Sequence, residues 1–121
     1  MSNVNNIQLS KNFNMKEFQC KCGCGTVKID KHLLEGVQGL RDRIGRAVKI
    51  NSGYRCPKHD KAVGGTGKGQ HVEGKAVDVK VVGYTPKQIA KIGEELGFNG
   101  IGTYPTFTHL DTRNHKARWN G

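Results

Sequence analysis

Residues 71–82 read HVEGKAVDVKVV and join a histidine, a short turn and a run rich in valine. The partial alternation and the β-branched residues of 76–82 predict a β-strand. Successive side chains of a strand point to opposite faces, so Asp78 lies on the face opposite to most of the valines. The strand therefore presents a carboxylate away from its apolar face, close in sequence to His71.

The segments on either side of this strand predict two helices and two further strands. Asp30 is a suitable N-cap for a helix whose apolar residues recur every three or four positions as far as Ile44, and Gly45 suits its C-terminal end. Thr85 and Pro86 are a typical start for a second helix. Short strands are expected at 47–50 and 107–111, and a glycine-rich loop at 63–74. This order predicts an α+β domain with a small, mostly antiparallel sheet and two main helices.

Length and composition fit one domain without a membrane span. The chain has 121 residues, of which 17 are glycine. We expect a flexible N-terminal lead at residues 1–12 and a single, monomeric domain at 13–121. No apolar stretch approaches the roughly 18 residues that span a bilayer, and the N-terminus lacks the apolar segment of a secretory signal. We therefore expect synthesis in the cytoplasm, with delivery by another route or release by lysis, as for phage products.

The charge of the chain favours polyanionic partners. A net charge of +10 implies attraction to anionic wall polymers or to nucleic acid, although the basic residues are scattered. The loop GGTGKG at 64–69 lacks the residue order of a phosphate-binding loop and does not lead from a strand into a helix. We therefore expect no nucleotide binding.

A second histidine completes a candidate metal site. His109 lies in the strand expected at 107–111, on the same face as Asp111. With His71 and Asp78 it gives two imidazoles and one carboxylate, a ligand set that fits Zn²⁺ with a fourth position open for water. Spacing alone also fits structural or surface histidines. Tyr104 and Trp119 either line a substrate groove or belong to the core.

Four motifs follow one another in a characteristic order: SGYR at 52–55, VGG at 63–65, H-x-x-G-x-A-x-D at 71–78, and H-x-D at 109–111 ahead of Trp119. Over most of residues 13–119 this set resembles the M15 family of zinc peptidases, in particular its D-Ala-D-Ala carboxypeptidase-like branch. The resemblance implies a Hedgehog/D-Ala-D-Ala-peptidase-like zinc site. His71, Asp78 and His109 would hold a catalytic Zn²⁺ that polarises a scissile carbonyl and activates water. The implied substrate is the stem peptide of peptidoglycan.

The resemblance also suggests catalytic residues, with two departures. Arg55 matches the family arginine that contacts the carbonyl or carboxylate of the substrate. Thr106 stands where several relatives have an acidic general base, and Gly69 stands where they tend to have serine. Asp111 is the predicted replacement base, or else it orients a ligand imidazole. Glu73 is the second candidate for the base.

The cysteines form a separate cluster, with three in CKCGCG and one after the SGYR turn: Cys20, Cys22, Cys24 and Cys56. The C-x-C-x-C spacing differs from that of a zinc ribbon. Three states remain open, namely a second, structural Zn²⁺ with four thiolates, disulfides that include Cys56, and free thiols.

Two functions follow from these features. The leading one is a zinc peptidase that hydrolyses an amide bond in the peptidoglycan stem peptide, as a D-Ala-D-Ala carboxypeptidase or an endopeptidase-type lysin. The alternative is a non-catalytic basic module on the same fold that binds wall polymer or nucleic acid. Thr106 and Gly69 favour the alternative, whereas the retained histidines, carboxylates and Arg55 favour the enzyme.

Overall fold

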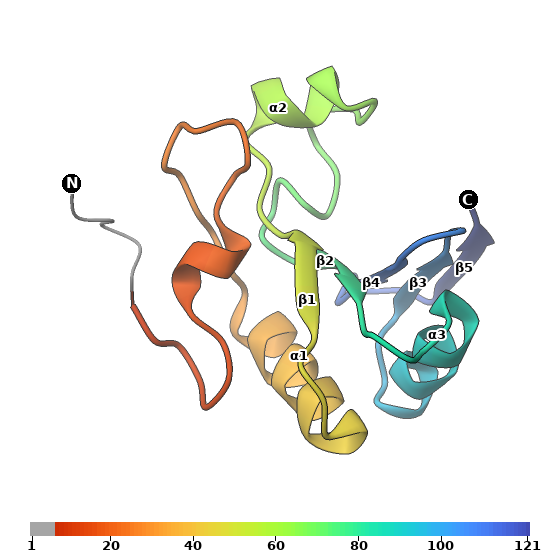
Figure 1. Cartoon of the computed structure of the whole chain (residues 1–121). Helices are drawn as coiled ribbons and strands as arrows, with labels where there is room; N and C mark the ends of the chain where they lie inside the picture. The colour runs from red at the N-terminus through yellow and green to blue at the C-terminus, as the bar shows by residue number, and fades with distance from the viewer. Residues whose placement is uncertain (1–6) are drawn as a thin grey trace.

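The strand predicted at 76–82 is an interior strand, β2, in a computed structural model that describes residues 7–121 (Figure 1). In chain order the elements are η1 (Met15–Phe18), α1 (Lys31–Ile44), β1 (Lys49–Ser52), α2 (Pro57–Ala62), β2 (Ala76–Lys80), α3 (Pro86–Glu95), β3 (Gly100–Thr103), β4 (Thr108–Asp111) and β5 (Ala117–Asn120). Over the described residues the strands form one sheet in the order β1-β2-β4-β3-β5. Neighbours pair antiparallel except β3 and β5, which are parallel. The predicted α+β class and mostly antiparallel sheet are confirmed.

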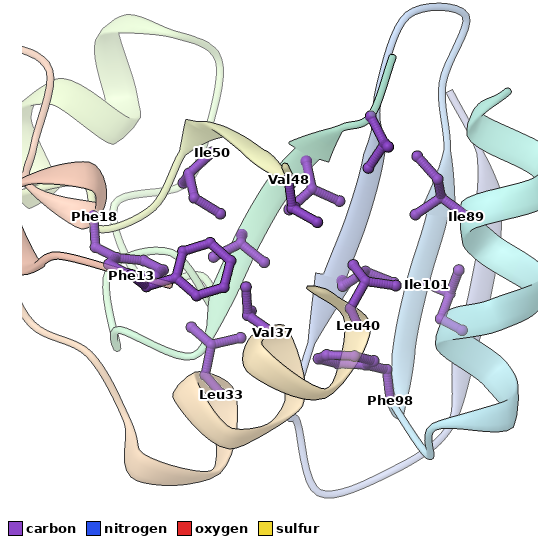
Figure 2. Close-up of a cluster of buried hydrophobic side chains, with 14 residues drawn as sticks. Phe13, Phe18, Leu33, Val37, Leu40, Val48, Ile50, Ile89, Phe98 and Ile101 are labelled. Carbon is purple, nitrogen blue, oxygen red and sulfur yellow. The ribbon is translucent and has the colours of Figure 1, made fainter. Parts of the chain in front are cut away.

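The core lies between one face of this sheet and the helices α1 and α3. Figure 2 shows Leu33, Val37 and Leu40 of α1 pointing at the strands, with Ile89 of α3 at the other end of the same cluster. The strands contribute the apolar half of their alternating pattern, which includes Val77, Val79, Ile101 and Leu110. Burial of these side chains holds both helices on the same face of the sheet. The opposite face, which carries Asp78, remains available for a polar site.

Local sequence signals fix both long helices where they were expected. The carboxylate of Asp30 accepts hydrogen bonds from the backbone of His32 and Leu33 at the start of α1. Gly45, with a φ of 73°, ends that helix in the left-handed region. Thr85 caps α3 in a reciprocal arrangement with Gln88.

Several boundaries differ from the expectation. The strand expected at 47–50 begins two residues later, because β1 pairs only as far as the end of β2. A register shift between Ile50 and Ser52 then places Ser52 opposite Asp78, as a β-bulge does. The short elements η1, α2, β3 and β5 were not predicted from the sequence, although a capping box of Asn14 and Glu17 begins η1 and Pro57 begins α2.

The first half of the N-terminal lead predicted at 1–12 lies outside the described residues. In its second half, the side chain of Gln38 on α1 bonds Ser10 and Asn12. Among residues 7–121 we find no helix that is both long and apolar enough to cross a membrane.

Candidate metal centre

The three predicted ligands come together on the sheet face opposite the core. Asp78 on β2 stands directly across from His109 on β4, and His71 approaches from the turn before β2. All three residues are more than nine-tenths buried. Their convergence follows from the pairing of two strands and a loop that are distant in sequence.

The ligand atoms point at one small volume. Nδ1 of His109 lies 3.1 Å and Nε2 of His71 lies 3.3 Å from the same carboxylate oxygen, Oδ1 of Asp78. One nitrogen or oxygen from each residue falls within 4.8 Å of the others. Two imidazole nitrogens and a carboxylate oxygen at such separations fit a Zn²⁺ ion with an open fourth position.

The second nitrogen of each imidazole already has a hydrogen-bond partner. Nδ1 of His71 lies 2.7 Å from the carbonyl oxygen of Gly53, which can only accept. Nε2 of His109 lies 2.6 Å from Oδ2 of Asp111. Donation of these N–H groups leaves Nε2 of His71 and Nδ1 of His109 with the lone pairs that a metal needs.

The charges of the site are strongly coupled. Burial raises the pKa of Asp78, but hydrogen bonds and charge from His109 and His71 outweigh it and hold that pKa well below its usual range. Burial lowers the pKa of His109, but its bonds to Asp111 and Asp78 raise it above its ordinary value. Because histidine binds a metal only in its neutral form, metal binding at Nδ1 of His109 should weaken as the pH falls.

Asp111 is enclosed behind His109. Its carboxylate accepts from Nη2 of Arg113 at 2.7 Å, from Nε of Arg113 at 2.9 Å and from the backbone N–H of Arg113 at 3.1 Å. Burial raises the pKa of Asp111, but His109 and Arg113 lower it well below the ordinary value. The cross-strand partner Gly100 has no side chain, and a Cβ there would collide with the carboxylate. Both oxygens of the carboxylate are therefore occupied by hydrogen bonds, and the role of Asp111 remains a prediction.

Arg55 lies at the opposite edge of the site. Its Nη2 donates to Oδ2 of Asp78 at 3.2 Å, its Nη1 to Asp60 at 3.1 Å and its Nε to Ser52 at 3.1 Å. The buried Asp60 also accepts from the backbone N–H of Gly67 at 2.9 Å. Asp60 thus fixes both Arg55 and the glycine-rich loop.

A cavity of about 330 Å³ opens above the ligands. Its lining comprises Arg55, Val63, Gly64, Gly65, His71, Asp78, Tyr104, Phe107, His109 and Trp119. Tyr104 and Phe107 stack with ring centroids 4.4 Å apart, and Nε1 of Trp119 donates to Oη of Tyr104 at 2.9 Å. One wall is therefore aromatic, and the glycine-rich loop forms the other.

Three other predicted positions lie apart from this cavity. The half-exposed carboxylate of Glu73 is not part of the lining, and it lies 4.0 Å from Nζ of Lys75. Thr106 is exposed in the turn between β3 and β4. Among the described atoms, none lies within 4 Å of a Cβ built on Gly69.

Three residues of the site were not predicted from the sequence: Asp60, Phe107 and Arg113. Arg113 carried a usable signal, because it follows Asp111 by two residues just past the end of a strand. Asp60 had no such signal. A short helix with a charged surface is the ordinary setting for an aspartate, and only the fold buries this one.

The fold and the site together define a metallopeptidase-like domain, in which a sheet presents two histidines and an aspartate beneath an open cavity. The chain belongs to the peptidase M15 family, whose family model matches residues 11–111. It is also similar to the probable peptidoglycan L,D-endopeptidase MepK of Haemophilus influenzae, with 26% identity over an alignment of 95 residues. That alignment covers 70% of this chain and 51% of the relative, so the chain spans about half the length of the curated relative it matches.

Proposed function

We propose that the chain is a zinc-dependent peptidase that hydrolyses an internal amide bond in the stem peptide of peptidoglycan. The observation that carries this proposal is the convergence of three potential ligand atoms, all within 4.8 Å of one another, among the residues that line the cavity. The name of the relative supports peptidoglycan as substrate and an internal bond as the point of cleavage. Such a substrate places the action at the bacterial cell wall.

His71, Asp78 and His109 would hold the zinc ion. When bound, the ion would supply Lewis acidity toward the scissile carbonyl and toward water. The carbonyl of Gly53 and the carboxylate of Asp111 keep the two imidazoles in the tautomers that bind metal. We assign Asp111 as a positioning residue, because His109 and Arg113 already occupy its enclosed carboxylate.

Arg55 has two tasks in this proposal. It orients Asp78 through Nη2, and as a residue of the cavity lining it would donate its remaining N–H groups to a substrate carbonyl. Both terminal nitrogens of Arg55 already bond the carboxylates of Asp60 and Asp78. The guanidinium is therefore not free to bind the terminal carboxylate of a D-Ala-D-Ala end with two parallel hydrogen bonds. This favours endopeptidase cleavage. Glu73 as the proton acceptor remains a prediction.

The test is digestion of purified sacculi, followed by mass analysis of the products. We expect new amine ends at an internal bond of the stem, loss of activity with a strong chelator, and recovery with zinc but not with magnesium. Release of single D-Ala residues would instead indicate a carboxypeptidase. Activity that survives chelation would exclude the metal mechanism.

One observation favours the alternative, a non-catalytic binding module. Among the described residues that line the cavity, no carboxylate other than Asp78 is present to accept a proton. If the chain is a binding module, it should bind sacculi or nucleic acid with an affinity that falls steeply with salt. It should also leave the sacculi undigested. Cosedimentation and digestion measured on the same sample separate the two functions.

A further inference from the structure

Four sulfur atoms gather where the turn at 20–26 meets the start of α2. Sγ of Cys20 lies 3.3 Å from Sγ of Cys22, and Sγ of Cys56 lies 3.7 Å from both. With Cys24 included, all four sulfurs lie within 4.8 Å of one another. Cys56 follows Cys20 by 36 residues, so the fold creates this proximity. Figure 1 shows the two segments side by side.

These separations match the corners of a metal tetrahedron. Four thiolates at about 2.3 Å from a Zn²⁺ ion lie about 3.8 Å from one another. A disulfide would bring two sulfurs to about 2.05 Å and leave the others out. Here Cys20, Cys22 and Cys56 are nearly equidistant, with sulfur separations of 3.3–3.7 Å. The spacing therefore favours one shared ion over a pair of bridges.

The backbone around the sulfurs is arranged to hold them. The N–H of Cys20 donates to the carbonyl of Thr26 at 3.0 Å and closes the turn. Gly23 and Gly25 adopt φ values of 88° and 76°, which let the chain bend sharply between the cysteines.

Backbone donors also reach the sulfurs. The N–H of Cys56 donates to Sγ of Cys20 at 3.4 Å, and the N–H of His59 donates to Sγ of Cys56 at 3.4 Å. Such bonds stabilise thiolate charge at a metal.

We propose that Cys20, Cys22, Cys24 and Cys56 bind a second ion, a structural Zn²⁺, that ties the N-terminal segment to the turn carrying Arg55. Four thiolates close the coordination sphere, so this ion takes no part in hydrolysis. Soft thiolate ligands in a tetrahedron select zinc over calcium or magnesium. Bound zinc would also shield the two exposed thiols, Cys22 and Cys24, from oxidation.

The turn at 53–56 lies between this site and the candidate metal centre. On one side, the N–H of Tyr54 donates to the carbonyl of Phe18 at 2.8 Å, and a Cβ on Gly53 would collide with Phe18. On the other side, the carbonyl of Gly53 holds His71, and Arg55 bonds Asp78. Loss of the cysteine-bound ion should therefore weaken metal binding at His71 by about 10-fold. This coupling rests on the proposed function, whereas the cysteine site does not.

Elemental analysis and cobalt substitution of the full chain test the proposal. We expect two zinc ions per chain, four titratable thiols after denaturation in chelator, and intense sulfur-to-cobalt charge-transfer absorption in the cobalt protein. The double variant Cys22→Ser/Cys24→Ser should lose one zinc and this absorption. His71→Ala should lose one zinc and keep the absorption. Lys21→Ser, an exposed change within the same turn, should keep both ions.

A wild-type protein without charge-transfer absorption, or with fewer than four thiols, would overturn the cysteine site. These wild-type measurements decide the question even where the double variant does not fold. The proposals for the two metal sites can also be overturned independently of each other. If His71→Ala leaves the zinc content unchanged while the double variant lowers it, the cysteine site stands and the proposed catalytic ion is excluded.

Discussion

The two faces of the sheet use the same strands for opposite purposes. On one face, Val79 and Leu110 are fully buried under α1 and α3. On the other face, their sequence neighbours Asp78 and His109 form an array of hydrogen-bonded charges beneath an open cavity. The apolar face supplies the stability that the polar face lacks, because buried charges contribute little net stability even when paired. Substitutions on the two faces should therefore affect different measurements.

The largest expected effect belongs to the polar face. His71→Ala removes one ligand, so we expect loss of the catalytic ion and a drop in catalytic efficiency, kcat/KM, by about 10³-fold or more, on the order of 4 kcal/mol. The apolar core is untouched, so thermal unfolding of the metal-free protein should change only through the lost partners of Asp78 and of the Gly53 carbonyl. Digestion of sacculi, zinc content and calorimetry measure these quantities. His115→Ala, at an exposed position, is the control that should match wild type.

The apolar face should show the reverse pattern. Leu110→Ala leaves a cavity beneath α3, whose Gly93 packs against the leucine, and should lower the free energy of unfolding by about 3 kcal/mol. The folded fraction should still bind zinc at His71. Urea unfolding measures the loss, with Val82→Ala as an exposed control that should change stability by less than about 0.5 kcal/mol. A folded Leu110→Ala protein without the metal would show that the two faces are not separable.

Substitution of Asp111 tests how far metal binding on the polar face depends on the hydrogen bond that orients His109. In Asp111→Asn the amide oxygen still accepts from His109, but the negative charge that pairs with Arg113 is lost. We expect zinc affinity to fall by about 10- to 100-fold, roughly 1.4–2.7 kcal/mol, with kcat largely recovered at saturating zinc. Competition titration measures the affinity, and Asp42→Asn on the exposed face of α1 is the matched control. A kcat that stays about 10²-fold low or lower at saturating zinc would identify Asp111 as the base instead.

The sequence predicted those parts of the fold that local chemistry determines. The caps at Asp30 and Thr85 fix the helices, and the valine run fixes β2. Strands β3 and β5 could not be predicted in this way, because two of the four residues of GIGT are glycine and the alternation of ARWN is only four residues long. Both strands exist because β4 and then β3 offer a free edge for pairing.

The candidate site likewise has one part that could be predicted from the sequence and one part that could not. The ligand set follows from residue types and motif order, and whether those ligands hold zinc remains a prediction. The environment of Asp111 depended on its complete burial, which the sequence does not display, whereas the position of Arg113 two residues later was a signal that could have been used. Asp60 likewise becomes part of the site only through the path of the glycine-rich loop.

The smallest effect concerns a glycine on the polar face. Gly102 on β3 lies opposite His109 and beside Trp119, where a Cβ would collide with the indole ring. Gly102→Ala should displace the indole from Tyr104, narrow the cavity and cost about 1–2 kcal/mol of stability. Tryptophan fluorescence and urea unfolding detect both changes. Gly39→Ala is the control with the opposite sign, because none of the described atoms obstructs a Cβ there and alanine stabilises a helix by about 0.5–1 kcal/mol. An unchanged fluorescence spectrum in Gly102→Ala would mean that the aromatic wall adapts, and that glycine on β3 is not what shapes the cavity.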